Sequence, residues 1–127
     1  RDMQYSDIHR LLERNKTQTI PVILLGDLNT KKSNSKDYSK MLECISMKDP
    51  TIKNKKLYTF DSNNYWNKNA SSSQLDYILI QHRKTDSRIV NTKILKPKFM
   101  FKGNQIDLSD HYAISAEIIF TKNSDPS

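Results

Sequence analysis

The sequence contains little cysteine, little glycine and no long apolar run, and each shortage excludes a class of protein. Cys44 is the single cysteine, which excludes an internal disulfide and a zinc site built from cysteines. With two glycines and 35% hydrophobic residues, the chain is neither fibrous nor of low complexity. No apolar run approaches the roughly 18 residues of a membrane span, and none resembles a secretory signal peptide. The 127 residues suit a single globular domain.

The formal net charge of +7 favours anionic partners such as nucleic acid, phosphate esters or acidic membrane surfaces. The lysines are nevertheless scattered, and they cluster only at Lys31-Lys32 and within residues 53–56. A generally soluble surface explains that distribution as well as a binding surface does. The charge therefore leaves the partner open.

Apolar spacing predicts helices and strands in an α/β layer arrangement. A helix is expected over residues 2–15, and a shorter one around Tyr38, Met41 and Ile45 that ends before Asp49-Pro50. Strands are expected over residues 20–25, 57–61, 75–81, 89–95 and 113–120. The first of these strands lacks alternation of apolar and polar residues, which predicts that it is buried on both faces.

Two polar side chains follow that first strand. In Gly26-Asp27-Leu28-Asn29, Asp27 and Asn29 are two residues apart and therefore point to the same side at the C-terminal edge of the strand. Sheets of α/β proteins usually carry their chemistry at that edge. A plain turn after a core strand gives the same pattern.

Further polar residues occur at the ends of later strands. Asp76 stands at the start of one strand, and Asp110 and His111 precede the last one. Carboxylates without thiolates favour an oxygen-seeking cation such as Mg²⁺. A histidine beside them supplies a general acid or base near neutral pH. This combination suits hydrolysis of a phosphate ester.

Three motifs, in this order, resemble those of the endonuclease/exonuclease/phosphatase superfamily, which is related to deoxyribonuclease I. They are Gly26-Asp27-Leu28-Asn29, Leu75-Asp76-Tyr77 and Ser109-Asp110-His111. Within the superfamily, the chain is most similar to the bacterial secreted neutral sphingomyelinases (sphingomyelinase C). That similarity lies in Thr59-Phe60-Asp61 before an Asn-rich loop, in residues 91–98 before an aromatic loop, and in residues 107–112.

The resemblance implies an α/β fold (α+β in some schemes), namely half of a four-layer α/β/β/α sandwich of the DNase I-like type. Residues 1–127 match the C-terminal half of one such domain. The N-terminal half, which carries the family's metal-binding Glu, a second His and an Asn, is absent from the sequence. Because the sequence also opens on Arg1 in a helix-like stretch, we expect it to be a piece of a longer protein, with the missing half as its partner.

The resemblance also implies roles for the motif residues. Asp27 would position the attacking water or a metal-bound hydroxide, and Asn29 would donate hydrogen bonds to the phosphoryl oxygens. His111 would be the general base, and Asp76 would orient its ring. Asp110 would bind the divalent cation, which is Mg²⁺ or another ion such as Mn²⁺ or Co²⁺.

The expected substrate, by the same resemblance, is sphingomyelin at a membrane surface, cleaved to ceramide and phosphocholine. The expected location is extracellular, although the residues themselves leave a cytoplasmic protein open. Trp66, Phe99 and Phe101 are the candidate contacts with substrate or membrane. Family members that attack membranes carry a longer apolar hairpin here, whereas Phe99-Met100-Phe101 is expected in a polar loop, with packing in the core as the alternative.

Two other functions stay open. A nuclease of the same superfamily would suit the net charge of +7 and would act on nucleic acid. A non-catalytic remnant or interaction module would use the apolar edge that half of a sandwich leaves exposed.

Overall fold

The computed structural model describes residues 2–14, 21–51, 56–81 and 85–122. Two helices and six strands lie within these ranges. In chain order they are α1 (Asp2–Arg14), β1 (Val22–Asp27), α2 (Ser35–Ile45), β2 (Asp76–Gln81), β3 (Thr85–Leu95), β4 (Lys98–Phe101), β5 (Asn104–Asp107) and β6 (Ala113–Lys122).

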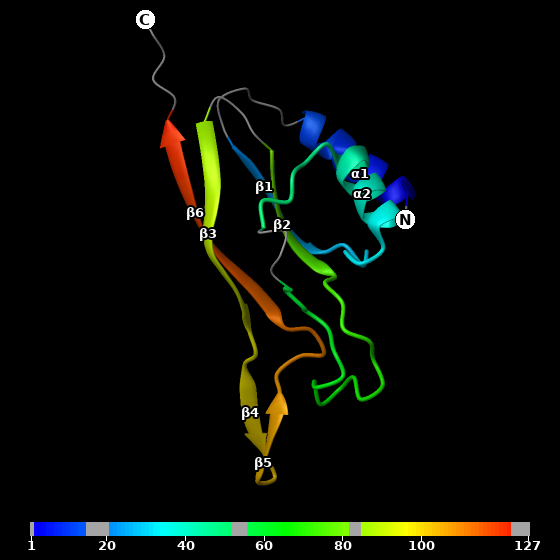
Figure 1. Cartoon of the computed structure of the whole chain (residues 1–127), viewed down its shortest axis with the longest axis vertical. Helices are drawn as coiled ribbons and strands as arrows, with labels where there is room; N and C mark the ends of the chain where they lie inside the picture. Colours follow the sequence, from blue (N-terminus) through cyan, green and yellow to red (C-terminus); the bar gives the residue numbers. More distant parts are fainter. Residues whose placement is uncertain (1, 15–20, 52–55, 82–84, 123–127) are drawn as a thin grey trace, which may run out of the picture.

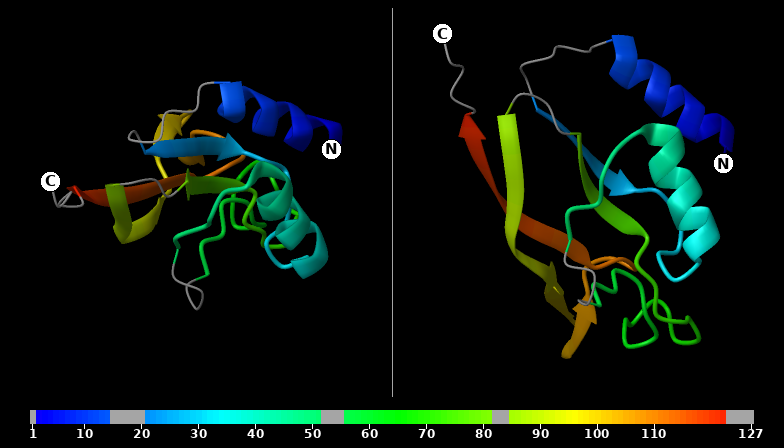
Figure 2. Two further views of the ribbon diagram at one scale, coloured as in Figure 1. Left: turned by 90° about the horizontal axis from the view of Figure 1, so that it is seen from above. Right: turned by 45° about the horizontal axis from the view of Figure 1, so that its top comes forward.

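In the described part of the chain, the strands form three antiparallel pairs, β1–β2, β3–β6 and β4–β5. Because β2 also contacts β6, the first two pairs lie next to each other. The helices α1 and α2 pack together on the side of β1–β2 that is away from β3–β6 (Figure 1, Figure 2). The prediction of a layered α/β arrangement is confirmed.

The hydrophobic core lies between the two helices and one face of β1–β2. Its fully buried members come from both helices, from the turn after α2 and from β2, and they are Tyr5, Met41, Ile45, Met47, Tyr77 and Leu79. Helix α2 begins where the Asn34 side chain accepts a hydrogen bond from the Asp37 N–H (3.2 Å), and it ends at Ser46, which has a left-handed φ of 60°. Both helices therefore form where the apolar spacing predicts them.

The prediction that β1 is buried on both faces is wrong. Val22 and Leu24 pack against the core, but Ile23 is 39% and Leu25 65% exposed. Successive strand residues point to opposite faces, and the described residues leave the second face of β1 largely uncovered. Beside it runs a groove of about 530 Å³ whose apolar lining includes Ile78 of β2.

The strand expected over residues 57–61 is absent. Only an isolated bridge joins Phe60 to Ser73, because the chain between them turns away through an Asn- and Ser-rich loop. Apolar and polar residues do alternate here, but in the part of the chain that the structure describes no strand pairs with this segment.

The polar loop expected around Phe99-Met100-Phe101 is instead the β4–β5 hairpin, which extends beyond the end of β3–β6 (Figure 1). Lys102 and Gly103 form its turn with φ of 49° and 79°, the left-handed pair that suits a tight two-residue hairpin. Phe99, Met100 and Phe101 are all exposed. Packing in the core, the alternative for this segment, is therefore wrong. No helix in the described ranges is long and apolar enough to cross a membrane.

Candidate active site

The antiparallel register of β1–β2 brings two carboxylates to one end of the pair. Asp27 is the last residue of β1, Asp76 is the first residue of β2, and the two are direct partners in the ladder. Residues that are 49 positions apart in the sequence thus meet because one strand ends where the other begins.

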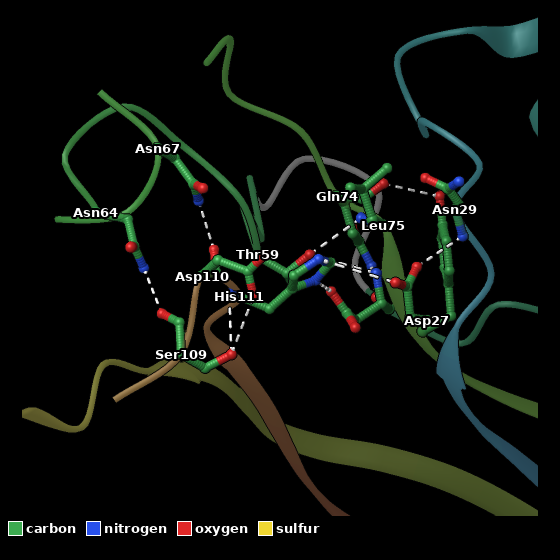
Figure 3. Close-up of polar contacts among 12 residues, drawn as sticks. Asp27, Asn29, Thr59, Asn64, Asn67, Gln74, Leu75, Ser109, Asp110 and His111 are labelled. Carbon is green, nitrogen blue, oxygen red and sulfur yellow. Dashed lines mark hydrogen bonds and ion pairs between the residues drawn. The ribbon is translucent and has the colours of Figure 1, made fainter. Parts of the chain in front are cut away.

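His111 completes this group from the segment between β5 and β6. Its Nδ1 lies 2.7 Å from Asp76 Oδ2, and its Nε2 lies 3.8 Å from Asp27 Oδ2. The imidazole thus lies between the two carboxylates, and Figure 3 shows it facing Asp27. A carboxylate at Nδ1 favours the neutral tautomer that keeps its hydrogen on Nδ1, which leaves the lone pair of Nε2 free on the Asp27 side.

The electrostatics of His111 result from opposing effects. Partial burial by itself lowers the pKa of the imidazole, but the hydrogen bond and charge of Asp76, with the charges of Asp27 and Asp110, outweigh it. The pKa of His111 is therefore raised above its ordinary value. The phenyl ring of Phe60 covers one side of the imidazole, with ring centroids 5.2 Å apart.

Asn29 lies at the bend that follows β1. Its N–H donates to Asp27 Oδ1 (2.8 Å), and its φ of 49° places it in the left-handed region, which asparagine tolerates better than most residues. Asn29 and His111 both line a cleft of about 590 Å³ that also includes Lys31, Asp37 and Phe60. The bend thus gives Asn29 and the imidazole access to one open volume.

Asp110, the predicted metal ligand, is exposed and stands apart from the group formed by Asp27, Asp76 and His111. Its carboxylate accepts a hydrogen bond from Ser109 Oγ (3.3 Å), and its charge still acts on His111. A role for Asp110 in metal binding stays a prediction.

Three side chains of the site offer donor atoms that could hold a cation. Among the described residues, ligand atoms of Asp27, Asp76 and His111 lie within 4.8 Å of one another. The two carboxylates are the oxygen donors that Mg²⁺ prefers. The donor set therefore fits an oxygen-seeking divalent cation.

The predicted contact residues lie away from the cleft lining. Trp66 is 55% exposed, packs edge-to-face against Tyr65 and donates from Nε1 to the Asp107 carbonyl (2.8 Å). Phe99 and Phe101 stand on the hairpin with ring centroids 6.5 Å apart. All three are exposed aromatic side chains, and their function stays a prediction.

Several residues that support the site were not predicted as site residues. Thr59, Asn64 and Asn67 bind the backbone around Asp76 and His111. Tyr112 donates to Asp61 (2.8 Å), and burial together with that carboxylate raises the pKa of Tyr112 to about 12, so its phenol stays neutral. The Thr59-Phe60-Asp61 motif contained two of these positions, but their contacts depend on tertiary structure.

No protein-family model matches the sequence, and no curated protein matches it significantly. The structure is similar to that of beta toxin 275-280 from Staphylococcus aureus, with a TM-score of 0.73 and 24% identity over 91% of this chain and 44% of that one. It is also similar to an endonuclease/exonuclease/phosphatase family protein from Leptotrichia buccalis C-1013-b, with a TM-score of 0.59 and 22% identity over 87% of this chain and 41% of that one.

The chain thus spans less than half the length of either of these solved structures. At such identities the likeness establishes the fold. The chain has the fold of part of a DNase I-like α/β sandwich.

Proposed function

We propose that this chain carries the general base of a divalent-cation-dependent phosphodiesterase. The observation that supports the proposal is the imidazole of His111 between two carboxylates, with Nδ1 on Asp76 and Nε2 toward Asp27 (Figure 3). A base oriented by one carboxylate and facing an open cleft is what activation of a water molecule requires.

Each residue of the site has a separate role in the proposed reaction. His111 Nε2 accepts a proton from the attacking water, and Asp76 stabilises the imidazolium that results. The separation of 3.8 Å between Nε2 and Asp27 Oδ2 lets one water contact both atoms, so Asp27 orients the nucleophile. The Asn29 amide donates to a phosphoryl oxygen as negative charge develops there.

A divalent cation, Mg²⁺ or an ion such as Mn²⁺ or Co²⁺, would neutralise negative charge on the phosphoryl group when the cation is bound. Because His111 Nε2 must stay free to accept a proton, the oxygens of Asp27 are the donors of the central group best suited to the cation. Asp110 is the further ligand that the sequence resemblance implies.

The proposed substrate is sphingomyelin, or another phosphodiester lipid, at a membrane surface outside the cell. Support comes from the resemblance in sequence and from the exposed aromatic rings of Trp66, Phe99 and Phe101. The hairpin that carries two of these rings also carries Lys98 and Lys102, while its one carboxylate, Asp107, is buried and paired with Lys98. Exposed aromatics with adjacent cations suit a lipid surface.

The proposed partner is the remaining part of the same sandwich. Leu25, which is 65% exposed, and the apolar groove beside it form the face that a second layer of strands would cover. We call this chain together with that remaining part the complete protein. A non-catalytic interaction module would use the same face, and activity of the complete protein distinguishes the two.

The test compares three substrates with the complete protein: sphingomyelin vesicles, a soluble phosphocholine ester and plasmid DNA. Hydrolysis of sphingomyelin that EDTA stops and Mg²⁺ restores is the expected result. Cleavage of DNA alone would favour the nuclease, which the net charge of +7 supports.

Substitution of the base adds a test of the assignment itself. His111→Ala should lower turnover by several orders of magnitude with little change in melting temperature, whereas His9→Ala, on α1 and outside the cleft, should leave turnover unchanged. Retention of activity by His111→Ala would rule out the proposed base.

A further inference from the structure

The backbone on both sides of His111 is held by one loop, formed by residues 59–67 (Figure 3). The Asn64 amide donates to the Ser109 carbonyl (2.8 Å), and the Asn67 amide donates to the Asp110 carbonyl. On the other side, the Tyr112 N–H donates to the Thr59 carbonyl (2.7 Å). His111 lies on an irregular segment between β5 and β6, so these contacts replace the ladder of a strand.

The same loop also holds the partner of His111. Thr59 is fully buried, and its hydroxyl accepts hydrogen bonds from the N–H groups of Leu75 (3.0 Å) and Asp76 (3.3 Å). The two members of the His111–Asp76 pair come from distant parts of the sequence, yet both are fixed against residues 59–67. A shift of this loop would change the distance between them.

Asn64 is the side chain in this loop best placed to transmit such a shift. It is 1% exposed, and both ends of its amide are used: Oδ1 accepts from the Trp66 N–H (2.9 Å), and Nδ2 donates to Ser109. Loss of the donor leaves the Ser109 carbonyl without that partner, and only one residue separates this carbonyl from His111.

We infer that Asn64 is a positioning residue: its amide fixes the Ser109 carbonyl and thereby sets the His111 imidazole between Asp76 and Asp27. Asn64 does not line the cleft, so its effect on the reaction passes through His111. The inference rests on the proposed function for its kinetic consequence, but its structural consequence can be measured without any substrate.

The kinetic test uses Asn64→Ala and Asn64→Asp in the complete protein. The aspartate keeps the size of the side chain and the acceptor for Trp66, but as a carboxylate it has no hydrogen for Ser109. Misplacement of a reacting group costs up to about 10²-fold in rate, so we expect kcat to fall roughly 10- to 100-fold in both variants. KM should stay within about twofold, because substrate contacts are unchanged.

The matched control is Asn63→Ala. Asn63 is the exposed neighbour of Asn64, and it bonds Asp61 through its backbone N–H, which the substitution keeps. Its kcat should equal that of the wild type. A fall in kcat for Asn63→Ala as large as that for Asn64→Ala would overturn the inference.

The structural test records the ring ¹⁵N shifts of His111 in metal-free protein at alkaline pH, where the imidazole is neutral. The wild type should show the tautomer with hydrogen on Nδ1, and Asn64→Ala should shift the population toward the Nε2–H tautomer that free histidine favours. If Asn64→Ala does not fold, Asn67→Ala tests the neighbouring carbonyl and should shift kcat and tautomer in the same direction.

Wild-type kcat and tautomer in Asn64→Ala, even with a lowered melting temperature, would make Asn64 a purely structural residue and overturn the inference. Absence of any phosphodiesterase activity in the wild type would instead reject the proposed function. In that case the tautomer measurement would still decide the role of Asn64.

Discussion

Substitution of Asp76 by Asn tests the pairing with His111 while keeping the size of the side chain. The carboxylate oxygen lies 2.7 Å from His111 Nδ1, so the substitution removes a charge-assisted hydrogen bond. Such a bond is worth about 1.5–3 kcal/mol net, which corresponds to roughly one to two powers of ten in rate. Loss of ring orientation adds to this, and the expected fall in turnover is roughly 10²–10⁴-fold.

The pH dependence of Asp76→Asn has a definite sign. The general base must be neutral, and the raised pKa of His111 delays that form to higher pH in the wild type. Without Asp76, only the charges of Asp27 and Asp110 remain to oppose the effect of partial burial, so the pKa of His111 falls relative to the wild type. The rising limb of kcat/KM should therefore move to lower pH in the variant, while the maximal rate decreases.

The His111–Asp76 pair contributes to folding stability at low pH, whereas the base acts at higher pH. Because folding raises the pKa of His111, the pair stabilises the protein most at pH below the ordinary histidine pKa, and this contribution is lost as pH rises through the raised value. Urea unfolding at about pH 5 and about pH 9 should show that Asp76→Asn reduces this difference, since the charges of Asp27 and Asp110 remain. A variant with near wild-type turnover and an unmoved rising limb would refute the pairing argument.

Three further variants test the other proposals. Asp110→Asn should raise the Mg²⁺ concentration needed for activity without changing the melting temperature, and an unchanged requirement measured by metal titration would remove Asp110 from the site. Phe99→Ala with Phe101→Ala should weaken action on sphingomyelin vesicles far more than on a soluble ester, because each ring at a lipid interface contributes about 1–3 kcal/mol; equal losses in the two assays would contradict the membrane contact. Leu25→Ser should weaken association with the remaining part of the sandwich, as measured by co-purification, and unchanged association would show that another surface makes the contact.

Much of the site could be predicted because its residues follow patterns that are local in the sequence. The apolar run before Gly26 predicted a strand over residues 20–25, which overlaps β1 (Val22–Asp27), and Asp76 marked the start of β2. Antiparallel pairing then placed Asp27 beside Asp76. No local pattern predicts that pairing, although polar residues at the ends of both strands are consistent with it. The helices were predictable for the same reason, since their apolar spacing is a property of each segment alone.

The errors arose where the outcome depends on a neighbour. An apolar run such as that of β1 predicts burial only if two layers are present, and the described residues supply one, so Leu25 stays exposed. The 57–61 segment had strand alternation, but among the described residues its only ladder contact is the isolated bridge from Phe60 to Ser73. The hairpin had a usable signal in Lys102-Gly103, a pair that can form a tight turn, but its three apolar residues in a row obscured the alternation. The role of Asn64 depends on a carbonyl 45 residues away, which no local pattern contains.

The proposed contact surface and His111, the proposed general base, are joined through a short series of hydrogen bonds. Lys98 of the hairpin pairs with the Asp107 carboxylate (3.0 Å). Asp107 also accepts a hydrogen bond from the Tyr65 N–H (2.9 Å) through its carboxylate and one from the Trp66 indole (2.8 Å) through its carbonyl. The Trp66 N–H in turn donates to Asn64, whose amide holds Ser109 next to the His111 segment. None of these bonds involves the exposed rings of the hairpin. Loss of those rings should therefore change attachment to a surface and leave hydrolysis of a soluble ester intact, which is why the soluble substrate separates the two roles.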